Sequence, residues 1–294
     1  MKNYRTYIGI DVAKLTLDYC IVKEDPQLEQ GQILNTQKSV DKFLKTLKKT
    51  GCQMNETLFV FENTGIYSSL LALVLSENSL DYAQVPALEI KRSLGITRGK
   101  SDKVDAKEIA HYAKRNTDKI ALSTLPELSL QQLKIVFAER EKTVAAIKTF
   151  ERTKENEMFL TKEVFNSVKA INNQTVKHLK KQLVMLDEKI RTLIREDENL
   201  YGQQQLLKSI PGIGDITSVY ILMATKGFTA FTSGRKFACY SGVAPFEHSS
   251  GTSIKGKTRV SHLADKKMKT LLHMASLTAI KYDPELKDYY NRKK

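Results

Sequence analysis

The chain has 294 residues, of which 41% are hydrophobic, and it carries a formal net charge of +14. This hydrophobic share supports a buried core and argues against a disordered protein. No apolar run approaches the roughly 20 residues that span a bilayer. The first residues also lack the layout of a signal peptide, so the sequence predicts a cytoplasmic protein with no membrane partner. The cysteines are isolated and are predicted to be reduced thiols.

The positive charge is concentrated in the last third of the chain. Residues 206–294 hold 15 lysines and arginines against 6 acidic residues, which gives +9 of the total charge of +14. An excess gathered in this way favours a polyanionic partner. Because the basic residues do not form an amphipathic apolar helix, we expect this partner to be a nucleic acid rather than a membrane surface.

Short apolar runs alternate with helical patterns in the first third of the chain. Strands are predicted in TYIGIDVAK, LTLDYCIVK and GQILNTQ, and later in TLFVFEN and DYAQVP. Helical spacing is found in SVDKFLKTLKK and IYSSLLALVLSE, and a further helix is expected to contain DAKEIA. The order of three strands, helix, strand, helix, strand and helix predicts a mixed α/β sheet with helices against it, in a domain covering residues 1–125.

The sequence predicts a helical segment at residues 126–205. Neither proline nor glycine occurs from residue 128 to residue 200, and apolar residues recur at threes and fours among charges of both signs. This pattern fits a pair of long antiparallel helices or a coiled coil, with a turn near residues 166–174. A helical spacer would explain most of these residues, and a coiled coil here also favours self-association.

Glycine and proline return in residues 206–294, which are predicted to form a mainly α domain. The stretch IPGIG lies between two apolar helical stretches. It fits either an ordinary connection between helices or a helix-hairpin-helix turn. In the second case Gly212 and Gly214 would allow backbone N–H groups to approach a phosphate closely, and the charge of this region favours such a contact with DNA.

Four acidic residues of the first domain are candidates for a metal site. Asp11 and Glu62 each end a predicted strand, and Asp102 and Asp105 lie three residues apart on one face of a predicted helix. Alone, an acid that ends a strand is commonly a turn residue, and the Asp pair also fits the first turn of a helix, where the helix dipole favours negative charge. Together they follow the order of an RNase H-like fold, and such carboxylates suit Mg²⁺-dependent phosphodiester chemistry.

The stretch EHSSGTSIKGKTRVS is rich in hydroxyls, glycines and cations and is expected to form a loop. A serine in it needs an activating base or metal before it can attack phosphorus, and no Ser-His-Asp pattern is apparent. Basic residues here and beside the acidic pair would meet DNA phosphates. The candidate nucleic-acid-binding residues are Arg98, Lys100, Gly212, Gly214, Lys255, Lys257 and Arg259.

These motifs resemble those of a known family. GIDVAK, ENTGIYS and RGKSDKVDAKEIAHYA look like the RuvC-like (RNase H-like) domain of the insertion-sequence-110 type transposases, which include the Piv-like invertases. SIPGIGDITSVYILMA and the later FACYSGVAPFEHSSGTSIKGKTRVSH are similar to the C-terminal transposase domain of that family. The resemblance covers nearly the whole chain, in the right order and at the right spacing.

The resemblance implies roles for individual residues. Asp11, Glu62, Asp102 and Asp105 would bind the metal. Ser250, directly before a glycine, would attack DNA and form a covalent 5′-phosphoserine link. Two other serines lie close in the sequence: Ser249 is the nearest competitor, and Ser241 is expected to be a packing residue.

By the same resemblance, the chain is a transposase or site-specific recombinase of a bacterial insertion sequence. The implied partners are Mg²⁺, donor and target DNA, a structured non-coding bridge RNA and further copies of the chain in a dimer or tetramer, acting at the nucleoid. One departure concerns Ala264, Asp265 and Lys269, where many relatives have a Gly-Asn pair and an arginine, so the nucleic-acid contacts of that helix are in question. Two alternatives remain: a metal-dependent nuclease or junction resolvase that uses the acids alone, and a non-catalytic DNA- or RNA-binding protein.

Overall fold

The computed structural model describes residues 2–23, 28–93, 102–250, 254–261 and 263–293. Some residues within helices and strands are described by their backbone alone: Asp102, Lys103, Thr153, Lys154, Asn156, Glu247, His248, Ser249, Ser250, Ile254 and Lys255. The described chain divides into the compact units 1–125 and 126–294, and each is considered by itself. The functional division into three domains, with a further boundary at residue 205, stays a prediction.

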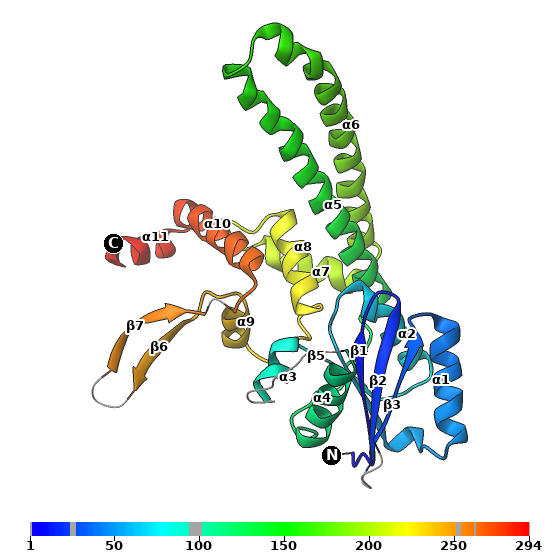
Figure 1. The fold of residues 1–294 in the computed structure, drawn as a ribbon. Coiled ribbons are helices and arrows are strands. Elements are labelled where there is room, and N and C mark those ends of the chain that lie inside the picture. The colour runs from blue at the N-terminus through cyan, green and yellow to red at the C-terminus, as the bar shows by residue number, and fades with distance from the viewer. Residues whose placement is uncertain (1, 24–27, 94–101, 251–253, 262, 294) are drawn as a thin grey trace. The chain divides into compact units, whose positions relative to one another are not determined.

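The first unit is a mixed sheet with helices on both faces (Figure 1). Its strand order is β3-β2-β1-β4-β5, in which β1 pairs antiparallel with β2 and parallel with β4. The strands are β1 (Thr6–Val12), β2 (Thr16–Lys23), β3 (Leu28–Leu34), β4 (Thr57–Glu62) and β5 (Tyr82–Val85). The helices are α1 (Gln37–Lys49), the 3₁₀ turn η1 (Met54–Glu56), α2 (Ile66–Glu77), α3 (Ala87–Ser93) and α4 (Asp102–Arg115). The predicted mixed sheet is confirmed, and α3 is an addition to it.

Alternating residues of β1 point to opposite faces of the sheet, as in any strand. Ile8, Ile10 and Val12 pack with α1 and α2, whereas Tyr7 packs with α3 and α4. Gly9 also lies on the α4 face. A β carbon on Gly9 would lie 2.2 Å from the backbone nitrogen of Ala110 and 2.4 Å from the carbonyl oxygen of Ala106, so only glycine admits this close approach of α4.

Helix α4 runs antiparallel to β1. Just beyond its C-terminal end, Thr117 Oγ1 donates a hydrogen bond of 3.1 Å to the hydroxyl of Tyr7. Near the same end, Lys114 Nζ donates at 3.0 Å to the carbonyl oxygen of Lys23, which is the register partner of Thr6 at the start of β1. The first turn of α4 therefore lies toward the opposite end of β1, where Asp11 is found.

The second unit contains a long arm formed by α5 (Leu128–Arg152) and α6 (Lys162–Arg195), which run side by side in opposite directions (Figure 1). The predicted helix pair is confirmed, whereas a coiled-coil geometry stays a prediction. The predicted turn at residues 166–174 is wrong, because these residues lie inside α6 and the connection is the 3₁₀ segment η2 (Thr153–Met158) with the residues that follow it.

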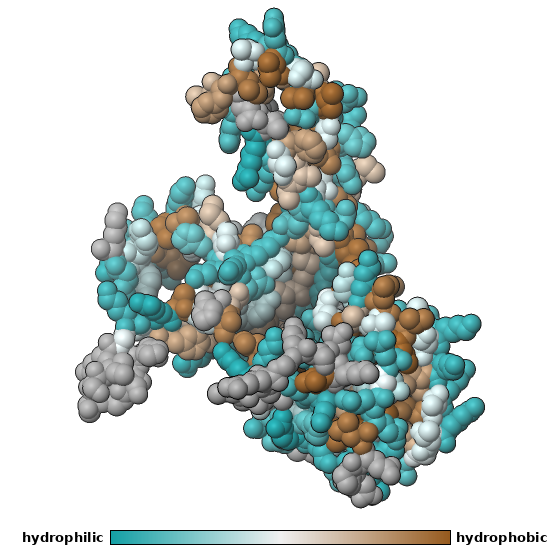
Figure 2. Space-filling model, viewed as in Figure 1, coloured by the Kyte–Doolittle hydropathy of each residue, from teal (hydrophilic) through white to brown (hydrophobic). Residues whose placement is uncertain are grey.

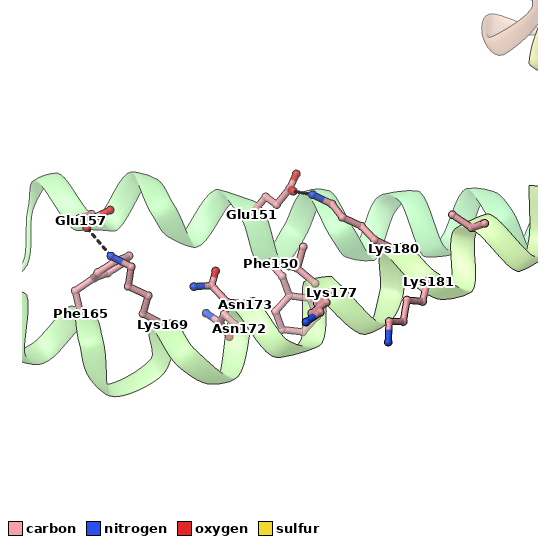
Figure 3. Close-up of a pocket in the computed structure, with 12 residues that line it drawn as sticks. Phe150, Glu151, Glu157, Phe165, Lys169, Asn172, Asn173, Lys177, Lys180 and Lys181 are labelled. Carbon is pink, nitrogen blue, oxygen red and sulfur yellow. Dashed lines mark hydrogen bonds and ion pairs between the residues drawn. The ribbon is translucent and has the colours of Figure 1, made fainter.

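The polar residues that suggested a turn have another effect. Asn172 and Asn173 line a hollow of about 690 Å³ between the two helices, together with the rings of Phe150 and Phe165 (Figure 3). The two asparagines thus lie beside the hollow, and α6 continues through them without a break.

Burial in the arm is concentrated at its base. Leu133, Phe137 and Ile194 pack there with Leu200 and Val219. At the outer end apolar side chains are exposed (Figure 2), including Met158 at 86% and Phe159 at 83%. None of the helices in the described ranges combines the length and the apolar character that a bilayer crossing requires.

The rest of the second unit is largely helical, as predicted. Its elements are α7 (Glu198–Lys208), α8 (Asp215–Thr225), α9 (Gly234–Tyr240), β6 (Pro245–Ser250), β7 (Ile254–Val260), α10 (Lys266–Tyr282) and α11 (Pro284–Lys293). The expected serine loop is wrong, because β6 and β7 form an antiparallel hairpin. In IKGKTRV, apolar or small residues alternate with cations, which is typical of a strand and indicates β7 from the sequence.

Candidate metal centre and serine hairpin

Asp11 and Glu62 come from neighbouring parallel strands. The pairing of β1 with β4 extends to Ile10 opposite Phe61, so the next residues, Asp11 and Glu62, follow at the C-terminal edge of the sheet. Ile10 and Phe61 face α1 and α2. Their neighbours Asp11 and Glu62 therefore lie on the α4 face, and both are half-buried.

The first turn of α4 faces the same edge of the sheet. Asp102 is its first residue, and the half-buried Asp105 directly precedes Ala106, whose carbonyl oxygen lies against Gly9 of β1. The side chain of Asp102 lies outside what the structure describes. Among the described side chains, no three acidic, histidine or cysteine groups form a complete metal-binding set. The fold thus brings the four predicted positions to one edge and one face, while their ligand roles stay a prediction.

Sequence reasoning missed a further carboxylate on this face. Asp18 of β2 is the register partner of Asp11 and is only 2% exposed. The amide of Gln32 on β3 donates to both of its carboxylate oxygens, at 3.1 Å and 3.0 Å. Residues directly opposite in antiparallel strands have β carbons about 5 Å apart, where two negative charges repel each other. The sequence feature that points to Asp18 is the position of an acid within a largely apolar predicted strand.

These donors fit a hard divalent cation. Carboxylate oxygens are the ligands that Mg²⁺ prefers, and a cation would offset the repulsion between Asp11 and Asp18. The loops that leave β3 and β4 at the same edge hold two buried oxygens, Asn35 Oδ1 and Thr64 Oγ1, which have no hydrogen-bond partner in the described part of the chain. The edge therefore offers both charged and neutral oxygen donors to a metal, its water or a phosphate.

Backbone conformation and packing explain one of the glycines in the IPGIG turn. Gly212 has φ +92°, and a β carbon there would lie 2.2 Å from the carbonyl oxygen of Ala275 in α10. Gly214 directly precedes α8, and the first residue of α8, Asp215, pairs with Lys208 at 2.6 Å. Contact of Gly212 or Gly214 with DNA stays a prediction beside this packing role.

The structure places the candidate serine at the end of β6. Ser250 pairs with Ile254 and Ser249 pairs with Lys255, but for these four residues only the backbone is described. Ser241 is fully buried and its hydroxyl donates to the carbonyl oxygen of Phe237 at 2.8 Å, as expected of a packing residue.

The predicted basic contacts are only partly described. Lys257 and Arg259 are exposed on β7, two residues apart and hence on one face. Lys255 is described by its backbone alone. Arg98 and Lys100 lie outside the described residues.

Asp265 anchors the chain where it leaves the hairpin. Its carboxylate caps α10 by accepting the N–H of Met268 at 2.9 Å. The hydroxyls of Tyr220 and Tyr240 donate to the same carboxylate at 2.8 Å and 2.9 Å. The backbone N–H of Asp265 also donates to the carbonyl oxygen of Tyr240 at 2.9 Å. The residue that departs from the family pattern thus joins the segments before and after the hairpin.

The electrostatics of this anchor follow from its hydrogen bonds. Burial opposes ionisation of Asp265, but the N–H of Met268 and the two tyrosine hydroxyls stabilise the carboxylate and lower its pKa below the usual value. Burial, followed by the hydrogen bond to Asp265 and its charge, raises the pKa of Tyr240 to about 12. The pKa of Tyr220 is raised by the same causes. All three groups therefore keep their hydrogen-bonding states at neutral pH.

Comparison with known proteins finds family matches in both units of the chain. A family model described as a transposase, of the DEDD IS110 type, matches residues 8–156. The model of the IS116/IS110/IS902 transposase family matches residues 204–291. The chain belongs to this transposase family. It is accordingly an enzyme of the DNA transposase and recombinase class, and its substrate is DNA.

Individual relatives extend the comparison. The pilin gene-inverting protein of Moraxella bovis is 28% identical over 277 residues, which cover 93% of this chain and 82% of that protein. An uncharacterized 43.6 kDa protein of insertion element IS110 from Streptomyces coelicolor is 30% identical over 89 residues, which cover 30% of this chain and 22% of that one. RuvC of T. thermophilus, solved with a Holliday junction substrate, aligns with a TM-score of 0.30 and 11% identity over 41% of this chain and 100% of RuvC. The fold assignment rests on the strand order and register given above, not on this alignment.

Proposed function

We propose that this chain cuts and rejoins DNA strands for a bacterial insertion sequence, with a serine nucleophile and a divalent metal site of the RuvC-like type. The observation that carries the proposal is the gathering of Asp11, Glu62 and the first turn of α4 at one edge and one face of the sheet. Asp102 and Asp105, which belong to that turn, complete the set of four acids. Bound there, Mg²⁺ would supply positive charge to a scissile phosphate.

The covalent step balances without an outside reagent. Ser250 Oγ forms a bond to phosphorus while the bond from phosphorus to the 3′ oxygen breaks. The serine proton passes, in net terms, to the departing oxygen, which becomes a 3′-hydroxyl, and the new 5′ end stays attached to the protein. Attack by a 3′-hydroxyl of another strand reverses these steps and joins the exchanged strands, so a Holliday-junction-like intermediate is the expected product of the first exchange.

Support for Ser250 comes from the Ser-Gly pair and from its place on the hairpin. The cations Lys257 and Arg259 are exposed on the adjacent strand, where they would neutralise the phosphates of a bound strand. Because the acids and Ser250 belong to different units, we propose that a dimer or tetramer combines them from different subunits.

Guidance by a structured bridge RNA belongs to the same proposal. It is supported by the family resemblance and permitted by the net charge of +14. Sequence choice would then be made by the RNA, and the protein would act in the bacterial cytoplasm, at the nucleoid.

Covalent trapping tests the proposal directly. The full chain, Mg²⁺ and RNA transcribed from the flanks of the element are incubated with labelled element-junction DNA and separated on denaturing gels. We expect a DNA–protein adduct in the wild type that is lost in Ser250→Ala and in Asp11→Asn. Ser249→Ala, which removes the neighbouring hydroxyl, serves as the matched control and should keep the adduct.

Each other outcome has a definite meaning. An adduct lost in Ser249→Ala but kept in Ser250→Ala would move the nucleophile by one residue. Cleavage without an adduct, unchanged in Ser250→Ala, would replace the proposal by a metal-dependent nuclease or junction resolvase. Salt-sensitive binding with no cleavage in any condition would leave a nucleic-acid-binding protein. An adduct that forms equally well without the RNA would remove the guidance part alone.

A further inference from the structure

Four basic side chains of α4 form a patch to which the predicted site assigns no role. This α4 basic stripe consists of Lys107, His111, Lys114 and Arg115. Residues three and four apart on a helix are neighbours, so the stripe is continuous on one side of α4. Lys107, Lys114 and Arg115 are exposed and His111 is half-buried. From Lys107 to Lys114 the stripe spans about 10 Å, at about 1.5 Å of rise for each residue.

Among the described residues, no carboxylate forms an ion pair with the lysines or the arginine of the stripe. Glu29 pairs with Lys23 at 3.4 Å. Lys114 donates to a backbone carbonyl, and Arg115 Nε donates to the carbonyl oxygen of His111 at 3.3 Å. Burial lowers the pKa of His111, and the charges of the three cations lower it further. Positive potential is therefore concentrated at this histidine.

The stripe lies on the β2 side of α4. Ala106 and Ala110 of α4 pack on Cys20 and Val22 of β2. Lys114 Nζ donates to the carbonyl oxygen of Lys23 in β2 at 3.0 Å, which places this end of the stripe beside β2. The positions that follow Lys107 by four and seven residues continue along the same flank of the helix.

Polar groups of β2 and β3 lie on the same face of the sheet as α4 and the acidic edge. Gln30 and Gln32 of β3 are the register partners of Cys20 and Asp18, so they lie on the α4 face, and both are exposed. Gln32 contacts Asp18, which is itself the register partner of Asp11. A path of polar groups thus runs from Asp11 across Asp18 and Gln32 toward the stripe.

We propose that the α4 basic stripe, with the amides of β3, binds the sugar-phosphate backbone of the DNA strand that extends away from the acidic edge. This inference rests on the proposed function, because that function places the scissile phosphate at this edge. Continuity with the edge favours DNA as the occupant over RNA. A length of about 10 Å corresponds to roughly three phosphates of one strand at about 3.4 Å each along a duplex axis.

A matched pair of double variants tests the inference in the full chain. Lys107→Gln with Lys114→Gln removes two charges from the stripe. Lys42→Gln with Lys45→Gln removes two exposed charges from α1, which packs on the opposite face of the sheet. Binding of a 30-nucleotide single-stranded DNA is measured over a range of salt. Each phosphate contact contributes about 0.7 to the slope of log affinity against log salt, so the stripe variant should lose about 1.4 and the α1 variant nothing.

A second measurement reports on the stripe itself. Histidine side chains are labelled for NMR, and the His111 signal is assigned with His111→Gln. Bound phosphates offset the nearby cations, so the same DNA should raise the pKa of His111.

The contrary outcomes are distinct. Equal loss of slope in both double variants would mean unspecific attraction and overturn the inference. A change at His111 with a single-stranded RNA but not with DNA would reassign the surface to RNA. Adduct formation that needs Asp11, with salt dependence unaltered in the stripe variant, would overturn this inference alone. Stripe-dependent DNA binding by a chain that never forms an adduct would overturn the proposed function alone.

Discussion

The two candidate halves of the site are built in opposite ways. The acids lie in a sheet whose central strands are packed on both faces, and their direct neighbours Ile10 and Phe61 are buried. Ser250 ends a hairpin strand whose described neighbours Phe246, Lys257 and Arg259 are all exposed. One half takes its geometry from a dense core, and the other from the few residues at the base of the hairpin.

This difference matches what each half would need chemically. Metal ligands must be held at fixed separations, which a packed core provides because interiors leave few voids. A nucleophile that forms and later releases a covalent bond to DNA must instead meet a large substrate, which requires an accessible carrier. We therefore expect substitutions that disturb the sheet to act through the fold of the first unit, and substitutions at the base of the hairpin to act on the position of the serine.

The largest effect is expected for Gly9→Ala. Its β carbon would lie 2.2 Å from backbone nitrogen and 2.4 Å from backbone oxygen of α4, so the helix must move. Overpacking of this kind costs about 3 kcal/mol. Because α4 carries Asp102 and Asp105, the adduct of the trapping experiment should also be lost. Urea unfolding measures the stability, and hydrogen exchange of peptides from α4 locates the change.

Gly202→Ala is the control for this substitution. Gly202 lies inside α7, and no atom lies within 4 Å of a β carbon built there. Alanine in a helix interior is more favourable than glycine by about 1 kcal/mol, so this variant should be slightly stabilised. A Gly9→Ala protein as stable as Gly202→Ala would show that α4 is not held against β1 as described.

A smaller effect is expected for Asp265→Ala at the base of the hairpin. The change removes a helix cap and the shared acceptor of Tyr220 and Tyr240, which together should cost about 2 kcal/mol. Asp283→Ala is the matched control, because Asp283 accepts the N–H of Leu286 at 3.0 Å at the start of α11 without a tyrosine partner. Its cost should be about 1 kcal/mol. Adduct formation should fall in the first variant and not in the second.

The pH dependence of this anchor has a definite sign. The pKa of Asp265 is lower in the folded chain than its usual value, so its contribution is present above about pH 4 and is lost as the pH falls through the folded pKa. Asp265→Asn cannot ionise and should show a weaker loss of stability on acidification than the wild type. Identical acid unfolding curves for the two proteins would contradict the role given to the ionised carboxylate.

The mixed sheet could be predicted because each strand carries its own signal. An apolar run such as TLFVFEN indicates a strand by its own composition, whichever segments pack against it. When two such strands are parallel, the acids at their C-terminal ends lie at the same edge of the sheet. The close approach of α4 at Gly9 and the register partnership of Asp11 with Asp18 could not be read in this way. Both depend on which residues of distant segments meet, and the local pattern does not encode that.

The two errors of prediction have a common cause. The sequence predicts a turn near residues 166–174 and a loop at the serine segment, and both stretches are rich in polar residues. In the arm, a helix of 34 residues continues through the polar positions, because extending a formed helix adds one hydrogen bond for each residue fixed and buried residues on both sides hold it. In the hairpin, pairing of β6 with β7 satisfies the backbone of an otherwise exposed segment. A polar residue indicates that its position is exposed to water. Only the spacing of polar and apolar residues distinguishes a helix, a strand and a loop at such a position.

The smallest effects are expected in the arm formed by α5 and α6. Its base is packed and its outer end is exposed, so it shows the same contrast as the two units. Near its base Arg140 Nε donates to Asp187 at 2.6 Å, and the Arg140 side chain is 14% exposed. Further out Lys180 donates to Glu151 at 2.7 Å, and the Lys180 side chain is 59% exposed (Figure 3). Arg140→Ala removes the ion pair of the half-buried Asp187 and loses the packing of the Arg140 stem, so it should cost about 2 kcal/mol.

Lys180→Ala is the matched change at the outer position, where an exposed ion pair contributes less than about 0.5 kcal/mol. Hydrogen exchange of peptides from α5 and α6 measures both variants and both positions in one experiment. Faster exchange confined to the base in Arg140→Ala, with no change in Lys180→Ala, would mean that the arm is held at its base alone. Equal acceleration in the two variants would show that the outer half of the arm, in spite of its hollow and its exposed apolar side chains, contributes as much as the base.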